Sequence, residues 1–174
     1  GQQFDKLIPS NKAISRVYIT ENENVWFANP QGLNVYQKQS DSFKTYSHDP
    51  EDTNSISSNR IITMLQDHDG RFWVGTGGGL DLFMNADQQP EEGRFRNYQK
   101  IFSKYDPGTK YNDDVIASLH EDHKQRLWVG TEHSGLIMID LQAFNHGKFI
   151  FKHFEENPNI PGTLNNNTIN TIFQ

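Results

Sequence analysis

The sequence predicts an all-β fold: a fragment of a β-propeller with about three four-stranded antiparallel blades and the first strand of a fourth. Three observations support this prediction. A segment centred on a Trp occurs three times, the copies keep their internal spacing, and turn residues divide each copy into short strands. The clearest copies are residues 66–80, which read QDHDGRFWVGTGGGL, and residues 121–136, which read EDHKQRLWVGTEHSGL. Repetition at a fixed period indicates a repeat protein.

The copies are aligned by Trp26, Trp73 and Trp128. An Ile stands twelve residues before each Trp, and a Gly-Leu pair follows each one. The first two Trp residues are 47 positions apart and the last two are 55 apart. Propeller blades of four strands have periods of roughly 40 to 50 residues, and insertions fall in their loops.

These offsets divide the chain into five parts. Residues 1–12 are a lead-in or the end of a preceding blade. Three blades are expected at 13–58, 59–113 and 114–162, and the first strand of a next blade at 163–174. In that last part Ile169 and Ile172 stand three apart, as Ile61 and Met64 do.

Within each blade, short apolar runs are separated by turns rich in Asn, Asp, Gly and Pro. In the first two blades the expected strands are 14–19, 24–28, 33–36, 43–46, 61–66, 71–75, 80–84 and 95–99. No amphipathic helix of ten or more residues is expected.

Composition narrows the class of protein. Aromatic residues make up 12% of the chain, which suits half-buried strands. The net charge is −6 and there is no basic cluster, so neither nucleic acid nor contact of this segment with a membrane is expected. There is no Cys and therefore no disulfide framework. No apolar run approaches the roughly 20 residues that span a bilayer, and the first residues do not resemble a signal peptide.

Segments that suggest catalysis or metal binding have simpler interpretations. The glycine run 75–79 lacks the Gly-Lys-Ser/Thr of a phosphate loop, so we expect a hairpin. His120 and His123 are three apart on a strand entering a turn, where side chains alternate faces, and they do not form a zinc motif. The Asp-rich turns around Asp67 and Asp122 lack the ligand pattern of a calcium loop.

No pair of carboxylates is fixed at the separation of roughly 5 to 9.5 Å that glycoside hydrolysis requires. Asp67 and Asp122 also stand six residues before their Trp, whereas the Asp of a sialidase Asp-box stands five before. We therefore expect no catalytic residue, no metal and no cofactor.

The recurrent residues of the module are expected to build the blades. A Trp at the same place in each module is interpreted as a packing residue between blades. The structural repeat consists of Trp26, Trp73, Trp128, Gly75, Gly130, Gly79 and Gly135.

The pattern Ile-x-x-Met/Leu-x-x-Asp-x-x-x-x-Phe/Leu-Trp-Val-Gly-Thr-x-x-x-Gly-Leu, followed by Phe-x-x-Tyr and Asp-Pro, resembles the two-component regulator propeller repeat. The first unit departs from it, with Thr20 at the Asp position and Ala28-Asn29 in place of Gly-Thr. The resemblance implies the periplasmic sensor of a Bacteroides-like hybrid two-component system, anchored in the inner membrane through other parts of its chain. Such systems sense oligosaccharides released from glycans and regulate genes for polysaccharide use.

A ligand is expected at the loops of one rim, because variable loops on a rigid scaffold usually carry recognition. The candidate residues are Asn59, Arg60, Asp113, His133 and Asn167. The open faces of the outer blades are expected to be covered by missing blades of the parent chain or by self-association. Two alternatives remain open: a propeller-type glycan hydrolase or lyase, and a protein-interaction propeller.

Overall fold

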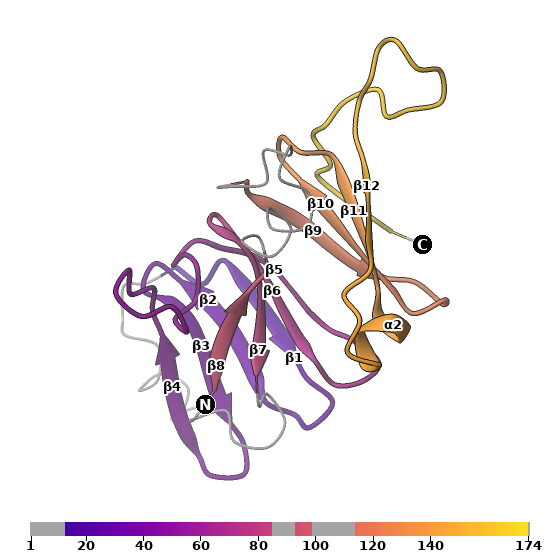
Figure 1. Cartoon of the computed structure of the whole chain (residues 1–174). Coiled ribbons are helices and arrows are strands. Elements are labelled where there is room, and N and C mark those ends of the chain that lie inside the picture. The colour runs from indigo at the N-terminus through magenta and orange to yellow at the C-terminus, as the bar shows by residue number, and fades with distance from the viewer. Residues whose placement is uncertain (1–12, 85–92, 99–113, 174) are drawn as a thin grey trace.

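The computed structural model describes residues 13–84, 93–98 and 114–173. This part of the chain forms three antiparallel sheets of four strands each, which Figure 1 shows arranged in an arc. In every sheet the strands follow one another in chain order. The predicted all-β propeller architecture is confirmed.

Each sheet is one blade. Blade 1 consists of β1 (Arg16–Ile19), β2 (Val25–Asn29), β3 (Gly32–Gln37) and β4 (Ser42–Tyr46). Blade 2 consists of β5 (Ile61–Gln66), β6 (Phe72–Thr76), β7 (Gly79–Met84) and β8 (Arg94–Asn97). Blade 3 consists of β9 (Ile116–Glu121), β10 (Arg126–Thr131), β11 (Leu136–Asp140) and β12 (Phe151–Phe154). The strands predicted for the first two blades agree with these bounds to within two residues.

The strand register shows that the sequence repeat is also a structural repeat. Trp26 lies opposite Val35, Trp73 opposite Leu82, and Trp128 opposite Met138. In each blade the partner is the third residue after the Gly of the Gly-Leu pair. The three Trp residues therefore occupy one equivalent position.

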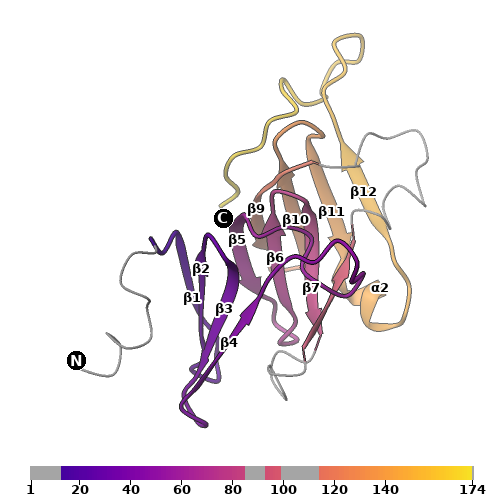
Figure 2. The ribbon, with the colours of Figure 1, turned by 90° about the vertical axis from the view of Figure 1, so that its left-hand side faces the viewer.

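Blade 2 is buried on both faces because successive side chains of a strand point to opposite sides. All five residues of β6 are buried. Phe72 belongs to a core cluster shared with blade 1, whereas its neighbour Trp73 belongs to a cluster shared with blade 3. Figure 2 shows the corresponding arrangement, with blade 2 between the other two sheets.

The Trp residues contribute to these two clusters. Trp26 is fully buried, and its ring centroid lies 4.5 Å from that of Phe72 in the next blade. Trp73 is also fully buried and lies 5.9 Å from Phe144 of blade 3. Trp128 is partly exposed, and its ring neighbour Phe154, at 5.9 Å, belongs to its own blade.

The Gly of the Trp-Val-Gly-Thr motif makes room for the next module. A Cβ added to Gly75 would lie 2.7 Å from Cγ2 of Ile116, the first residue of β9. A Cβ added to Gly130 would lie 2.8 Å from Cγ2 of Ile169. Such contacts are too short for real Cβ atoms, so glycine at these positions permits close packing of successive modules.

The Asp that stands six residues before the Trp organises the turn between the first two strands of blade 2. Oδ2 of Asp67 accepts hydrogen bonds from Arg71 Nε at 2.6 Å and from Trp73 Nε1 at 2.8 Å. Its Oδ1 accepts from the backbone N–H groups of Asp69 and Arg71. The interpretation of this Asp as a turn residue is confirmed.

Blade 3 repeats the same network. Oδ2 of Asp122 accepts from Arg126 Nε at 2.7 Å and from Trp128 Nε1 at 2.8 Å, while Oδ1 accepts from the N–H groups of Lys124 and Arg126. Burial raises the pKa of Asp122, but the hydrogen bonds from Arg126, Trp128 and the backbone outweigh it. The net result is a pKa well below the ordinary value.

The strand expected within 163–174 is not formed in the described residues up to 173. Ile169 N donates to Thr131 O, and Gly135 N donates to Asn167 O, both at 2.8 Å, so the segment lies along one end of blade 3. The first strand of a blade is paired mainly by the second strand of the same blade. Among the described residues, no strand lies after Ile169.

The helix α2 (Leu141–Asn145), between β11 and β12, was not predicted. Its N-cap is Asp140, whose side chain accepts from Ala143 N at 2.9 Å. Five residues are too few to produce a helical hydrophobic period. Within the described ranges, no helix has the length and apolar character needed to cross a bilayer.

Candidate ligand-binding rim

One end of the three blades carries the hairpins 29–32, 76–79 and 131–135, and we call it the hairpin rim. The motif Thr holds each of the last two hairpins. Thr76 Oγ1 accepts from Gly78 N and donates to Gly79 O. The Thr at position 131 makes the equivalent bonds to residues 134 and 135. The rim is therefore a set of braced turns suited to presenting other side chains.

Arg60 lies on the hairpin rim immediately before β5. Its carbonyl accepts from Gly77 N at 2.8 Å, which fixes its backbone. Its guanidinium Nη2 lies 3.9 Å from Glu132 Oε1 of blade 3. The two side chains are 66% and 35% exposed, so this pair contributes at most about 1 kcal/mol. The guanidinium is therefore accessible to a ligand.

His133, the residue after Glu132, is oriented by a buried carboxylate. Asp114 is 4% exposed and accepts from His133 N at 3.2 Å, while its Oδ1 lies 3.1 Å from His133 Nδ1. A carboxylate at this distance favours the proton on Nδ1. The imidazole is 78% exposed. Its Nε2 can thus accept a hydrogen bond from a ligand hydroxyl.

The two Asn residues among the predicted ligand-binding residues make equivalent hydrogen bonds within the fold. Asn59 Oδ1 accepts from His48 N at 2.7 Å, and Asn167 Oδ1 accepts from Glu156 N at 2.6 Å. Each bond ties the chain that leaves one blade to the start of the next module. Because the side-chain oxygens of both Asn residues already accept backbone hydrogen bonds, Arg60 and His133 are the better placed candidates for ligand binding.

The structure places Arg60 beside Glu132, the residue that precedes His133, whereas Asp113 lies outside the described residues. Sequence reasoning missed Asp114 and Glu132. The repeat spacing could have identified Asp114. It stands two residues before an Ile, at the same place in its module as the candidate residues Asn59 and Asn167.

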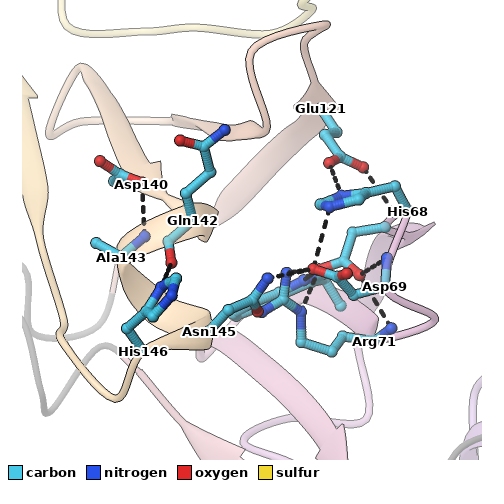
Figure 3. Close-up of polar contacts among 11 residues, drawn as sticks. His68, Asp69, Arg71, Glu121, Asp140, Gln142, Ala143, Asn145 and His146 are labelled. Carbon is cyan, nitrogen blue, oxygen red and sulfur yellow. Dashed lines mark hydrogen bonds and ion pairs between the residues drawn. The ribbon is translucent and has the colours of Figure 1, made fainter.

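A second polar cluster lies at the opposite end of the blades, where blade 2 meets blade 3 (Figure 3). We call it the blade 2–blade 3 clamp; its residues are His68, Asp69, Arg71, Glu121 and Asn145. His68 N donates to Glu121 Oε2 at 2.9 Å, and its ring Nδ1 contacts Glu121 Oε1. Asn145 Nδ2 donates to Asp69 Oδ2, and Arg71 Nη1 donates to Asn145 Oδ1.

Asp67, His68 and Asp69 are spaced closely enough to hold a metal ion. Their carboxylates are, however, already in use. Arg71 pairs with both Asp67 and Asp69, at 2.6 and 2.8 Å, and Trp73 donates to Asp67. The blade 2–blade 3 clamp is therefore best described as a polar contact between two blades, in which Arg71 pairs with Asp67 and Asp69.

A buried carboxylate also fastens the crossover between blades 1 and 2. Asp81 is fully buried in β7, and its Oδ2 accepts from Ser57 N and Ser57 Oγ. Asn97 Nδ2 donates to its Oδ1 at 3.3 Å. Burial raises the pKa of Asp81 to about 6, although the bonds from Ser57 and Asn97 and the nearby His48 oppose this.

The fold and this geometry define a β-propeller assembled from repeated blades, in which the motif residues hold the blades together. The family model described as the two-component regulator propeller matches residues 55–78 and 110–133. The chain therefore carries two-component regulator propeller repeats, and the resemblance stated from the sequence is confirmed.

Relatives and solved structures agree with this result. The Histidine kinase P4 of Formosa agariphila is 33% identical over 72 residues, which are 39% of this chain and 5% of that protein. This chain therefore spans a small part of that kinase.

Two solved structures share the fold. A protein from B. thetaiotaomicron, described as the extracellular domain of a hybrid two component system, gives a TM-score of 0.65 at 20% identity, over 95% of this chain and 19% of that one. YCF48 from Cyanidioschyzon merolae gives 0.52 at 15% identity, over 87% of this chain and 42% of that one. These identities establish the fold alone.

Proposed function

We propose that this chain is part of the extracytoplasmic, ligand-sensing propeller of a hybrid two-component sensor, and that it has no catalytic activity of its own. The observation that carries the proposal is the family match at 55–78 and 110–133. The similarity to a histidine kinase and to an extracellular domain of a hybrid system supports it. The parent protein would be anchored in the inner membrane, with this segment in the periplasm.

The ligand is proposed to be an oligosaccharide released from a glycan, bound at the hairpin rim. Arg60 supplies hydrogen-bond donors, His133 Nε2 an acceptor, and Glu132 a carboxylate. A few convergent polar groups on a rigid scaffold are typical of small-molecule sites. Binding would be passed through the parent chain to a kinase and would regulate genes for polysaccharide use.

The two outer faces of the three-blade unit also need partners. Val17 and Ile19 of β1 are 57% and 63% exposed, and Phe154 of blade 3 is 38% exposed beside the partly exposed Trp128. Exposed apolar clusters mark interaction surfaces. We propose that further blades of the parent chain cover these faces, and that this chain alone associates with a second copy.

The test is isothermal titration of this chain with a panel of oligosaccharides prepared from plant, algal and host glycans. One class of oligosaccharide is expected to bind, and Arg60→Ala and His133→Ala are each expected to weaken binding about tenfold. Lys124→Ala, on the opposite end of blade 3, is the control and should leave the affinity unchanged. Its side chain is exposed, as the tested ones are.

Three outcomes would contradict the proposal. Turnover of a polysaccharide by the chain would indicate a hydrolase or lyase instead. Binding of a folded protein with no response to any oligosaccharide would indicate a protein-interaction propeller. Equal loss of affinity in the rim variants and the control would remove the rim from the site.

A further inference from the structure

Aromatic side chains pack between neighbouring blades near their outer strands. Blades 2 and 3 share an aromatic cluster in which Phe144 and Phe149, from the segment after β11, lie 5.8 and 5.3 Å from the ring of Tyr98. Phe144 also contacts Trp73. The chain thus uses its own side chains to close this space.

Between blades 1 and 2, Phe83 and Phe95 likewise lie 5.0 and 5.4 Å from the ring of Tyr46. Beside this aromatic cluster is a cleft of about 540 Å³, which we call the blade 1–blade 2 cleft. Strand β4 forms one wall and the start of β8 another, and the crossover residues 49–56 close the third side. Phe95 N donates to Asn54 O at 2.8 Å, which fastens the crossover to β8. Clefts of this size hold small organic ligands.

The lining of this cleft combines an apolar floor with polar walls. The floor consists of buried residues, Tyr46, Ile56 and Phe95, which are at most 9% exposed. The walls carry hydroxyl and charged groups, from Lys44, Thr45, Ser47, Asp49, Asp52 and Arg94. An apolar floor with hydroxyl-rich walls suits a sugar ring, which has both an apolar face and a hydroxylated edge.

The charged groups of the cleft have different partners. Asp49 Oδ1 already accepts from Glu51 N, and Asp52 Oδ1 from Asn54 N, in the turns of the crossover. By contrast, neither Lys44 nor Arg94 forms an ion pair with any residue in the described ranges. The two cations therefore offer charge-assisted hydrogen bonds to an acid group.

We propose that the blade 1–blade 2 cleft binds a uronic acid unit of an oligosaccharide, with the carboxylate held by Lys44 and Arg94. The inference rests on the proposed function and adds to it both a second location and an acidic class of ligand. Arg is suited to the planar carboxylate, which it binds through two parallel N–H donors.

The experiment is calorimetric titration of this chain with disaccharides of glucuronic, galacturonic and mannuronic acid, each compared with its methyl ester. The ester keeps the shape of the ligand and removes its charge. At least one of the acids is expected to bind, with an affinity about tenfold or more above that of its ester. Lys44→Gln and Arg94→Gln should each weaken that binding about tenfold.

Lys152→Gln is the matched control, because Lys152 follows the first Phe of β12 as Lys44 follows Phe43 in β4, and it does not line the cleft. This variant should bind like the unaltered chain. All three Lys and Arg side chains belong to exposed residues, so the folds should be equal by circular dichroism.

The cleft assignment is overturned if acid and ester bind equally, if none of the acids binds, or if the Lys44 and Arg94 variants match Lys152→Gln. Failure here can be separated from failure of the proposed function. A different oligosaccharide that binds and is weakened by the Arg60 and His133 substitutions would leave the sensor proposal standing. The absence of binding to any oligosaccharide would remove both.

Discussion

Blades 1 and 2 contain the same four strands in the same register, but they differ in how they hold their Trp. In blade 2, Asp67 accepts a hydrogen bond from the indole of Trp73. In blade 1, Thr20 takes the place of the Asp and bonds instead to Asn22 and to Asn24 O. Among the residues that the structure describes, the buried Nε1 of Trp26 has no hydrogen-bond partner.

This difference shows that a blade needs the buried Trp, whereas the hydrogen bonds of the Asp are an addition. Both Trp residues are fully buried, so packing against the next blade is sufficient to build the sheet. The Asp network provides further stabilisation and a fixed turn. A buried donor without a partner costs about 1 to 3 kcal/mol, and blade 1 tolerates that cost.

At a second position, blade 1 holds its hairpin with a different residue from the one that blade 2 uses. Asn29 stands where blade 2 has Thr76, and its Oδ1 accepts from Gln31 N at 2.9 Å, as Thr76 Oγ1 accepts from Gly78 N. Both side chains hold their hairpin by the same bond to the N–H group two residues later. Blade 1 has therefore lost the indole acceptor but retained the hairpin brace.

The largest effect is expected for Trp73→Ala, which would leave a cavity between blades 2 and 3. Truncation of a large buried aromatic residue costs about 3 to 5 kcal/mol in the free energy of unfolding. Trp128→Ala should cost less than half as much, because Trp128 is partly exposed. Urea unfolding followed by circular dichroism measures both. Equal losses would contradict the assignment of Trp73 to the contact between blades.

The next effect concerns Asp81, which occupies the position of Asn34 in blade 1. Burial raises its pKa to about 6, above the value of about 3.9 expected in the unfolded chain. The folded state therefore binds the proton more tightly. Stability attributable to this group is full below about pH 4 and is lost as the pH rises through 6, by about 3 kcal/mol in total.

Asp81→Asn should remove this pH dependence and make blade 2 resemble blade 1 at the position. The measurement is the free energy of unfolding of both chains between pH 4 and pH 7.5. Their difference should shift in favour of the variant as the pH rises. A difference that stays constant over this range would show that Asp81 has an ordinary pKa.

A smaller gain is expected when the motif is restored in blade 1. Thr20→Asp with Asn24→Arg places an acceptor and its guanidinium partner where blade 2 has Asp67 and Arg71. Trp26 Nε1 would then have a partner, and the free energy of unfolding should increase by about 1 kcal/mol. The same pair made as Thr20→Asn with Asn24→Gln is a control that lacks the charges. A loss of stability in the charged variant would mean that the turn of blade 1 cannot adopt the geometry of blade 2.

The fold was predictable because turn residues and the repeated offsets both divide the chain into strands. Helix α2 was not predictable, because it is a single turn or little more that depends on the N-cap Asp140. The candidate rim was predictable only in part. A sequence shows that Asn59 and His133 lie in loops, but not that the amide of Asn59 bonds to His48 N while His133 remains exposed.

Asp81 and Asp114 also show that a sequence does not reveal the tertiary contacts of a side chain. Each is a carboxylate whose partners, Ser57 and His133, are brought to it by tertiary structure, at sequence separations of 24 and 19 residues. Nothing in the local pattern distinguishes a buried Asp from an exposed one in such short strands and turns. The repeat offsets are the one sequence signal that would have identified Asp114.

The central claim is that the Asp of the repeat stabilises a blade by bonding to the Trp, and that blade 1 lacks this bond. The most direct test is a pair of double-mutant cycles on the free energy of unfolding. In blade 2 the cycle combines Asp67→Val with Trp73→Phe, and in blade 1 it combines Thr20→Val with Trp26→Phe. We expect a coupling of about 1 to 3 kcal/mol in blade 2 and none in blade 1. Additive losses in blade 2, or an equal coupling in both blades, would contradict the claim.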